Sequence, residues 1–268
     1  MDKPVVVKVG GALLENATAL QNLLGALQTM QQSRPVVLVH GGGNGVEQLM
    51  QQLGLKTEKH QGLRVTPDEH MPIITGALAG TANKAICAAA YALQVNTVGL
   101  SLFDGNSVKC EVLSAKLQAV GTPSPDQPQL LQSLLAAKQL PVISSIGCDP
   151  SGRLLNVNAD QAATAIAQLL NADLYLLSDV PGVLDGDKQL ISSLTQVLAT
   201  QLIQDGVIQA GMLVKVNAAQ TAATTLGHGV TIGDWSTPDA LVQHASTNNK
   251  QNYGTYVHAV SPQQEVQL

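Results

Sequence analysis

The stretch Pro-Val-Val-Val-Lys-Val-Gly-Gly at residues 4–11 places Lys8 inside an apolar run that ends in two glycines. The β-branched residues predict a buried strand over residues 4–9, and the glycines predict a sharp turn after it. A lysine in such a strand needs an anionic partner, because burying an unpaired ammonium group is costly. Lys215 lies in a similar setting, the apolar run Met-Leu-Val-Lys-Val at 212–216. The two lysines together indicate a bound phosphate.

Outward from this first strand, short β-branched runs alternate with helical patterns. Further strands are expected at 35–39, 97–100, 141–146, 173–178 and 229–232. Helices are expected between them, at 44–53, 66–91, 128–139, 160–171, 195–204 and 212–226. The alternation predicts an α/β fold, a three-layer sandwich whose central, mainly parallel sheet carries helices on both faces.

Two segments, 55–65 and 101–113, interrupt the alternation and are expected to be hairpins. Thr66, Pro67 and Glu69 have the pattern of a capping box at the start of the helix at 66–91. The chain of 268 residues is long enough for two lobes. We place their boundary before the strand at 173, which gives an N-terminal lobe of residues 1–172 and a C-terminal lobe of residues 173–268.

Composition excludes several classes of protein. Although 45% of the residues are hydrophobic, no uncharged apolar stretch reaches the roughly 18 residues of a membrane span. No secretory signal pattern is present, so a cytoplasmic protein without a membrane partner is expected. The net charge of −5 argues against nucleic acid as a partner. Cys87, Cys110 and Cys148 form no Cys-x-x-Cys pair and are expected to be buried free thiols.

The glycine clusters at 10–11 and 41–43 both follow predicted strands. In an open α/β sheet, ligands bind beyond the carboxyl ends of the strands, where glycines allow backbone amides to approach anionic oxygens. Either cluster alone fits an ordinary strand-to-helix turn equally well. Two clusters, with Lys8 beside one of them, favour a phosphate site.

Known motifs narrow the chemistry. The chain has no Gly-x-x-x-x-Gly-Lys-Ser/Thr sequence, so it is not a P-loop nucleotidase. The stretch at 41–46 lacks the final small residue of the dinucleotide fingerprint, and neither His-Glu-x-x-His nor Gly-x-Ser-x-Gly occurs. The remaining candidate activity is that of a kinase that uses none of these motifs.

The segment Asn-Val-Asn-Ala-Asp at 156–160 places three polar side chains at the entrance to an apolar helix. The simpler interpretation is a helix cap made by Asn158 or Asp160. Asp160 would have a second role if the fold brought it between Lys8 and Lys215, because a carboxylate there would fix both ammonium groups.

Seven segments together resemble the N-acetylglutamate kinases, the second enzymes of arginine biosynthesis and a branch of the amino acid kinase superfamily. They are Lys-Val-Gly-Gly at 8–11, His-Gly-Gly-Gly at 40–43, Gly-Leu-Arg-Val-Thr at 62–66, Gly-Ala-Leu-Ala-Gly-Thr-Ala-Asn-Lys at 76–84, Asn-Val-Asn-Ala-Asp-Gln-Ala-Ala at 156–163, Leu-Ser-Asp-Val-Pro-Gly-Val at 177–183 and Gly-Met-Leu-Val-Lys at 211–215. The segments at 62–66 and 156–160 point to the acetylglutamate branch. The resemblance implies ATP-dependent phosphorylation of the side-chain carboxylate of N-acetyl-L-glutamate.

The resemblance also implies roles for individual residues. Lys8 and Lys215 would stabilise charge on the transferring phosphoryl group, with Asp160 orienting them as a third catalytic residue. The implied substrate-binding residues are Gly42, Gly43, Arg64 and Asn156. The implied ATP-binding residues are Gly10, Gly11, Asp179, Val180, Pro181, Gly182, Val183, Leu184, Val207, Ile208 and Gln209. Magnesium would be held by the nucleotide phosphates, with no metal site made by the protein, and a homodimer formed through the N-terminal lobe is implied.

The chemistry of arginine also supports a substrate-binding role for Arg64, which is one of only three arginines. Its planar fork suits a carboxylate, although a surface arginine on a hairpin remains the alternative. The acceptor carboxylate, with the ordinary pKa of a glutamate side chain at about 4.3, needs no general base at neutral pH. His40 is accordingly expected to be a strand-end residue rather than an acid or base, and Lys84 to be a solvated helix residue.

Two other functions stay open at this point. A kinase for glutamate, aspartate or carbamate would share the glycine turns but would not need Arg64. A nucleotide-binding sensor that lost its chemistry would keep the same fold. The joint presence of Lys8, Asp160 and Lys215 argues against the sensor.

Overall fold

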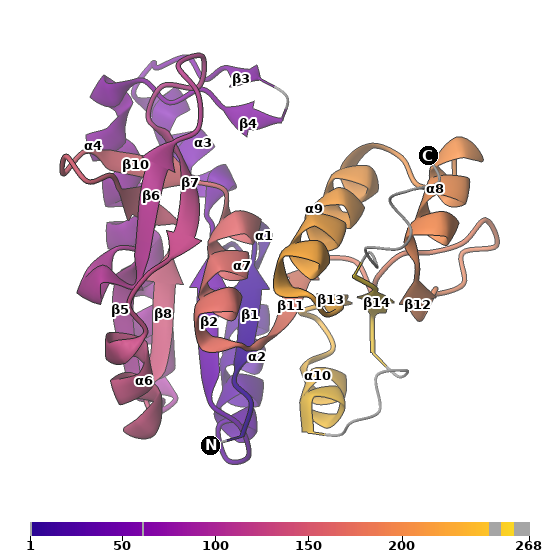
Figure 1. The fold of residues 1–268 in the computed structure, drawn as a ribbon. Helices are drawn as coiled ribbons and strands as arrows, with labels where there is room; N and C mark the ends of the chain where they lie inside the picture. Colours follow the sequence, from indigo (N-terminus) through magenta and orange to yellow (C-terminus); the bar gives the residue numbers. More distant parts are fainter. Residues whose placement is uncertain (1, 61, 247–252, 260–268) are drawn as a thin grey trace.

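The computed structural model describes residues 2–60, 62–246 and 253–259, and its central feature is an eight-stranded sheet (Figure 1). In spatial order the strands are β12 (Ser193–Leu194), β14 (Thr255–Val257), β13 (Val230–Asp234), β11 (Asp173–Ser178), β1 (Val5–Val9), β2 (Val36–His40), β8 (Leu140–Ser144) and β5 (Thr97–Ser101). Among these described strands only β13 and β14 pair antiparallel. The expected mainly parallel sheet is confirmed.

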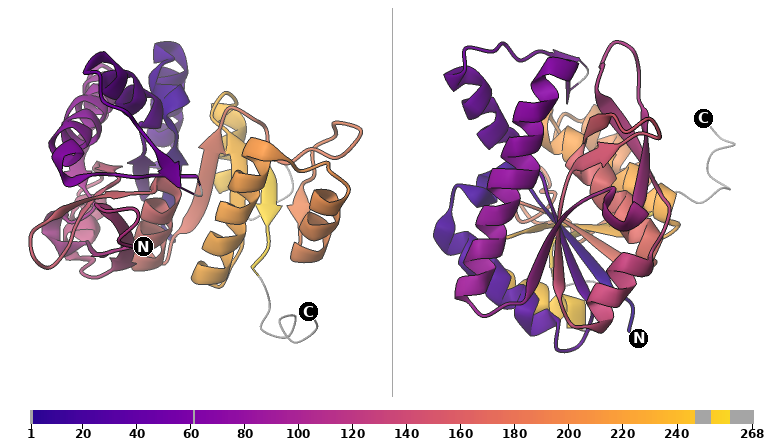
Figure 2. Two further views of the ribbon diagram at one scale, coloured as in Figure 1. Left: turned by 90° about the horizontal axis from the view of Figure 1, so that it is seen from above. Right: turned by 90° about the vertical axis from the view of Figure 1, so that its left-hand side faces the viewer.

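Helices cover both faces of this sheet, as Figure 2 shows. One face carries α2 (Ala17–Met30), α5 (Asn83–Ala92) and α10 (Pro238–Ser246), and the other carries α6 (Gln129–Ala136), α7 (Ala159–Leu170) and α9 (Ala210–Leu226), with α8 (Gln196–Gln204) packed on α9. Side chains of β1 alternate between the two hydrophobic cores: Val5, Val7 and Val9 join one, and Val6 joins the other. The three-layer sandwich is thereby confirmed.

The N-terminal half adds two smaller sheets. One has the order β6 (Val108–Val112), β7 (Val120–Pro125), β10 (Leu154–Val157) and β9 (Ile146–Cys148), and the other is the antiparallel pair β3 (Lys59–His60) and β4 (Leu63–Arg64). The hairpin expected within 55–65 is therefore present. The hairpin expected at 101–113 is wrong, because β6 pairs with β7 across a longer connection. A 3-10 turn, η3 (Asp104–Asn106), separates β5 from β6 instead.

A long helical run consists of η1 (Asp68–His70), α4 (Met71–Thr75), the π-helix η2 (Gly76–Ala82) and α5. The predicted capping box is wrong. Thr66 is buried and its hydroxyl donates to the carbonyl of Arg64, while Pro67 takes the cap position without a side-chain hydrogen bond. By length and composition alone the run Asp68–Ala92 could cross a membrane, but one such helix is weak evidence for a membrane span. In the described structure α5 packs on β5, β8 and α2.

The three cysteines are free, as expected, but only Cys110 is buried, and Cys87 and Cys148 are half-buried. Asp173, where the sequence placed the lobe boundary, is the first residue of β11. This strand pairs directly with β1, so the sheet continues across the boundary.

Candidate active site

The two glycine turns lie at one edge of the sheet, because they follow the parallel neighbours β1 and β2. Gly10 precedes the short helix α1 (Gly11–Leu14), and Gly42 precedes α3 (Gly43–Gln52). A Cβ added to Gly11 would lie 3.3 Å from the amide nitrogen of Asn44, so the two turns are in contact. A Cβ on Gly42 would lie 2.7 Å from Leu78 Cδ2. Glycine at these positions therefore lets the turns pack closely and leaves their amides uncovered by side chains.

Lys8 and Asp160 form the charged centre of this edge. The period of β1 points Lys8 to the face of Val6, which α7 covers, and its Nζ lies 2.8 Å from Asp160 Oδ1. The side chains are 16% and 25% exposed, respectively. Asn158 caps α7 by accepting hydrogen bonds from the amides of Asp160 and Gln161, as one of the two sequence interpretations held. The cap fixes the first turn of α7, and with it Asp160, against the strand.

Lys215 reaches the same region from α9 but has a different partner. Its Nζ lies 3.3 Å from Asp179 Oδ1, and these side chains are 35% and 64% exposed. Lys8, Asp160 and Lys215 do line one small cavity of about 40 Å³. The expectation that Asp160 would bridge both lysines is thus met only for Lys8. Asp179, which directly follows β11, is the carboxylate that pairs with Lys215. The pKa of Asp179 is lowered mainly by a hydrogen bond from its own backbone amide and, to a smaller extent, by Lys215.

A second cavity, of about 170 Å³, lies beside the glycine turns and brings together Gly42, Gly43, Arg64 and Asn156. The Arg64 side chain is only 12% exposed, so the alternative of a solvated surface arginine is wrong. Its Nη2 lies 2.6 Å from Glu47 Oε2, whereas its Nη1 is buried and has no hydrogen-bond partner among the residues that the structure describes. Because buried donors are nearly always paired, Nη1 is an unsatisfied donor in a residue that lines this cavity. Asn156 donates from Nδ2 to Thr66 Oγ1 at 3.1 Å.

The residues compared with ATP-binding segments form a loop after β11 and the entrance to α9. Gly182 has φ +150°, and a Cβ there would lie 2.6 Å from Thr255 Oγ1. The amide of Val183 donates to the same hydroxyl at 2.8 Å, so β14 holds the loop from behind. Val183 and Ile208 are buried in one core, and Gln209 is the N-cap of α9. The remaining members of the two segments, Val180, Pro181, Leu184 and Val207, are half-buried or exposed.

His40, at the end of β2, is wholly buried beneath the glycine turn. Its Nδ1 donates to the carbonyl of Gly41 at 2.8 Å, and its Nε2 accepts from Asn83 Nδ2 at 3.1 Å. Burial lowers the pKa of His40 from 6.5 to about 4, against the smaller opposing effect of the Gly41 hydrogen bond. A neutral histidine with both nitrogens engaged is a structural residue, as the sequence suggested. Lys84 is exposed on α5, as expected.

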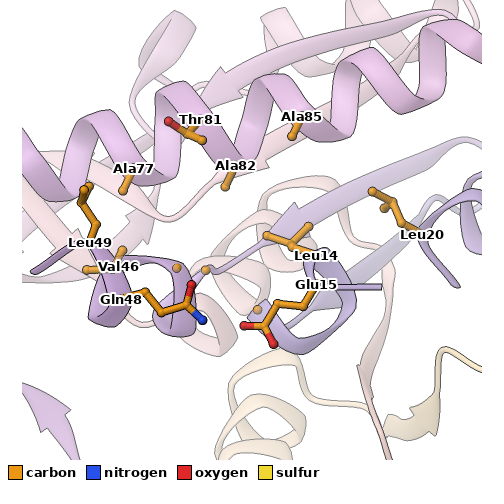
Figure 3. Close-up of a pocket in the computed structure, with 13 residues that line it drawn as sticks. Leu14, Glu15, Leu20, Val46, Gln48, Leu49, Ala77, Thr81, Ala82 and Ala85 are labelled. Atoms are coloured by element: carbon orange, nitrogen blue, oxygen red, sulfur yellow. The ribbon is translucent and has the colours of Figure 1, made fainter. Parts of the chain in front are cut away.

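A larger cavity, of about 340 Å³, lies behind the glycine turns (Figure 3). Leu14 and Val46 lie on one side of it and Ala77, Ala82 and Ala85 of the long helical run on the other. Among the described residues that line it, Glu15 is the one charged side chain, and none is a cation. The larger cavity therefore does not suit an anionic substrate, and the smaller cavities with Lys8, Lys215 and Arg64 do.

Sequence reasoning missed two residues of this edge. Ser178 lines the cavity of Lys8 and Lys215, and its hydroxyl is buried with no hydrogen-bond partner in the described ranges. Its place directly before Asp179 could have indicated it. Glu47 pairs with Arg64, but nothing in the spacing of the two residues links them.

A parallel sheet covered on both faces, with two glycine turns and two lysines at its carboxyl edge, defines a class of small-molecule kinases that work without a P-loop. The chain belongs to the amino acid kinase family, whose family profile matches residues 3–234. The acetylglutamate kinase of Pasteurella multocida (strain Pm70) is 53% identical over 241 residues, which are 89% of this chain and 94% of that protein. The acetylglutamate kinase of Serratia proteamaculans (strain 568) is 54% identical over 240 residues, 89% of this chain and 93% of that protein.

Solved structures agree on the fold. The crystal structure of smu.665 from Streptococcus mutans UA159 has a TM-score of 0.77 at 27% identity, and the match covers 97% of this chain and all of that one. An N-acetylglutamate synthase from Neisseria gonorrhoeae, complexed with coenzyme A and N-acetyl-glutamate, has a TM-score of 0.80 at 23% identity. This match covers 97% of this chain and 60% of the synthase, and shows a shared fold alone.

Proposed function

We propose that this protein transfers the γ-phosphoryl group of ATP to the side-chain carboxylate of N-acetyl-L-glutamate, giving N-acetyl-L-glutamyl 5-phosphate. The reaction is the second step of arginine biosynthesis. Acetylglutamate kinases 53% and 54% identical to this chain support it. The structural observation that carries the proposal is Arg64, which lines the cavity beside the glycine turns and whose buried Nη1 has no hydrogen-bond partner among the described residues. A diacid substrate offers one carboxylate to this guanidinium and a second to the phosphoryl donor.

In this proposal Arg64 and Asn156 bind the α-carboxylate end of the substrate. Gly42 and Gly43 hold oxygens at the reacting end, where their amides belong to the N-terminus of α3 and its positive potential. Both groups line the same cavity. The substrate would therefore lie with its side-chain carboxylate toward the glycine turns and Lys8.

The chemistry then depends on alignment and charge neutralisation. The acceptor carboxylate is already ionised at neutral pH, so it needs no general base. The carboxylate and the γ-phosphate repel each other, and Lys8 and Lys215 would offset this repulsion in the transition state. Asp160 would act as a positioning residue for Lys8, which it holds at 2.8 Å.

The nucleotide would be held by Gly10 and Gly11, by the loop Asp179–Leu184 and by residues 207–209. Among residues 2–60, 62–246 and 253–259, no group of three or more His, Cys, Asp or Glu side chains could hold a metal ion. We expect magnesium to enter with ATP and to keep phosphate oxygens and water as its ligands. Magnesium would supply charge neutralisation between the phosphates, and no residue of the chain is assigned as its ligand.

We further propose that residues 1–172 form the acetylglutamate-binding lobe and residues 173–268 the ATP-binding lobe, of which 247–252 and 260–268 lie outside the described residues. A homodimer through the N-terminal lobe is supported by two features. β5 is one of the two edge strands of the described sheet, and only 28% of an apolar 18-residue stretch within Asp68–Ala92 is buried. A cytoplasmic location fits a biosynthetic enzyme with these substrates.

The test is turnover of magnesium-ATP with N-acetyl-L-glutamate in hydroxylamine, which converts an acyl phosphate into a hydroxamate that is detected as its coloured iron(III) complex. Glutamate, aspartate and carbamate are run beside it, carbamate by ADP release. Hydroxamate from the acetylated substrate alone is the expected result. Turnover of another acceptor instead would assign a different amino acid kinase activity, and ATP binding without any turnover would indicate a sensor.

A further inference from the structure

The carboxylate of Glu47 connects three elements around the proposed substrate cavity. One oxygen accepts the hydrogen bond from Arg64 Nη2 at 2.6 Å, and the other accepts a hydrogen bond from the hydroxyl of Thr57. Glu47 belongs to α3, Arg64 to β4, and Thr57 to the segment that leads into β3. Helix α3 begins with the glycine turn at Gly43, so this carboxylate joins the hairpin to the helix that carries the turn.

This contact fixes the direction of the guanidinium. Nη2 is held by Glu47 and lies 3.5 Å from the carbonyl oxygen of Gly43, while Nη1 is buried and has no partner within the described part of the chain. Because a guanidinium is planar, holding one terminal nitrogen also sets where the other points. The cavity with Gly42, Gly43 and Asn156 is lined by the same Arg64. Glu47 therefore engages Nη2 and leaves the hydrogen bonds of Nη1 unused.

The charges around Glu47 support an ionised carboxylate at this position. The hydrogen bond from Thr57 is the largest influence that lowers the pKa of Glu47, and Arg64 and Lys59 act in the same direction, against the opposing effect of burial. Lys59 faces Arg64 across the β3–β4 pair. The carboxylate thus lies among two cations and a hydroxyl.

We propose that Glu47, oriented by Thr57, is the positioning residue that holds Arg64 for the α-carboxylate of the substrate. By tying Arg64 to α3, it also sets the separation between the α-carboxylate clamp and the glycine turn at the reacting end. This inference rests on the proposed function, because it assigns a role within the same site. It makes the preference for a free α-carboxylate depend on a residue that does not touch the substrate.

The experiment uses the full chain and two substrates, N-acetyl-L-glutamate and its α-amide, which keeps the side-chain carboxylate but lacks the α-carboxylate charge. Glu47→Ala is expected to raise the KM for N-acetyl-L-glutamate at least about tenfold, with kcat and the KM for ATP within about twofold of wild type. The kcat/KM for the α-amide should stay within about twofold, so the preference for the α-carboxylate falls. Glu47→Gln retains an acceptor for Nη2 and should keep most of this preference.

Two further variants complete the design. Thr57→Val removes the hydroxyl that orients Glu47 and should lower the preference about threefold, and it carries the test if Glu47→Ala does not fold. Glu58→Ala is the matched control, because it removes a neighbouring exposed carboxylate that makes no side-chain hydrogen bond or ion pair in the described structure. This control should leave KM and kcat for both substrates unchanged.

Equal losses for the two substrates in the Glu47 and Thr57 variants would overturn the inference, since a merely structural role affects both alike. Unchanged kinetics in these variants would overturn it as well. Failure of the proposed function is distinguishable from either result. In that case the wild-type protein itself would give no hydroxamate from N-acetyl-L-glutamate.

Discussion

His40 should make the protein less stable in mild acid. It is wholly buried, and burial lowers its pKa from 6.5 in the unfolded chain to about 4 in the folded protein. Between these values the unfolded chain binds a proton that the folded protein does not. The free energy of unfolding therefore falls as the pH falls from 6.5 towards 4, and the stability of the neutral form is fully present above 6.5.

The size of the effect follows from the two pKa values. The full lowering corresponds to about 3 kcal/mol, and at about pH 5 the loss relative to about pH 7 is about 2 kcal/mol. Protonation of His40 should also disturb the site, because a protonated Nε2 could no longer accept the hydrogen bond from Asn83. That bond lies directly beneath the glycine turn that begins at Gly41.

Urea unfolding of the wild type and of His40→Gln at about pH 7 and about pH 5 measures this contribution. Glutamine does not titrate, and its carboxamide oxygen can accept a hydrogen bond. The wild type should lose about 2 kcal/mol more than the variant between the two pH values, since the other histidines affect both proteins alike. Equal losses, or a His40 NMR signal that titrates near its ordinary pKa in the folded protein, would refute the reasoning.

Three further predictions concern the site directly. Arg64→Ala should raise the KM for N-acetyl-L-glutamate about ten- to a hundredfold with little change in kcat, measured by initial rates over both substrates, and an unchanged KM would contradict the clamp. Lys215→Ala should lower kcat about a hundred- to a thousandfold while the Kd for ATP, measured calorimetrically, changes little. A comparable loss of ATP affinity would contradict a role in the transition state. Gly182→Ala should lower the free energy of unfolding by about 1–3 kcal/mol and raise the KM for ATP, because its Cβ would meet Thr255 at a positive φ. Normal stability and KM in this variant would show that the loop adapts.

The parts of the fold that sequence predicted best depend on local patterns. The β-branched run at 4–9 and the glycines after it determine a buried strand and its turn without reference to the rest of the chain, and β1 forms there. Asn158 caps α7 because a short polar side chain at a helix entrance bonds its own next amides. The alternation of strands and helices was enough to predict a central sheet with a layer of helices on each face.

The sequence predictions were wrong where contacts with distant segments determine the local structure. Thr66 has the local pattern of a cap, but its backbone pairs with Leu117 and Ala119, and this long-range contact buries it. Segment 101–113 has a hairpin pattern, but the partner of β6 is β7. The link between Glu47 and Arg64 joins a helix to a hairpin, and its two ends carry no pattern that pairs them. Contacts of this kind follow from the assembled fold, so a single sequence does not display them.

The two lysines of the site differ in a way that suits different tasks. Lys8 is fixed in the middle of the sheet, mostly buried, and held by Asp160 at 2.8 Å. Lys215 and Asp179 are 3.3 Å apart and much more exposed, and exposed ion pairs contribute only about 0–1 kcal/mol. In the proposed reaction Lys215 would therefore exchange its carboxylate for a phosphoryl oxygen at little cost, whereas Lys8 would keep its partner and position. Of the two, Lys215 is thus the lysine whose contact is best suited to form as charge develops on the phosphoryl group, and its removal should affect kcat more than ATP binding.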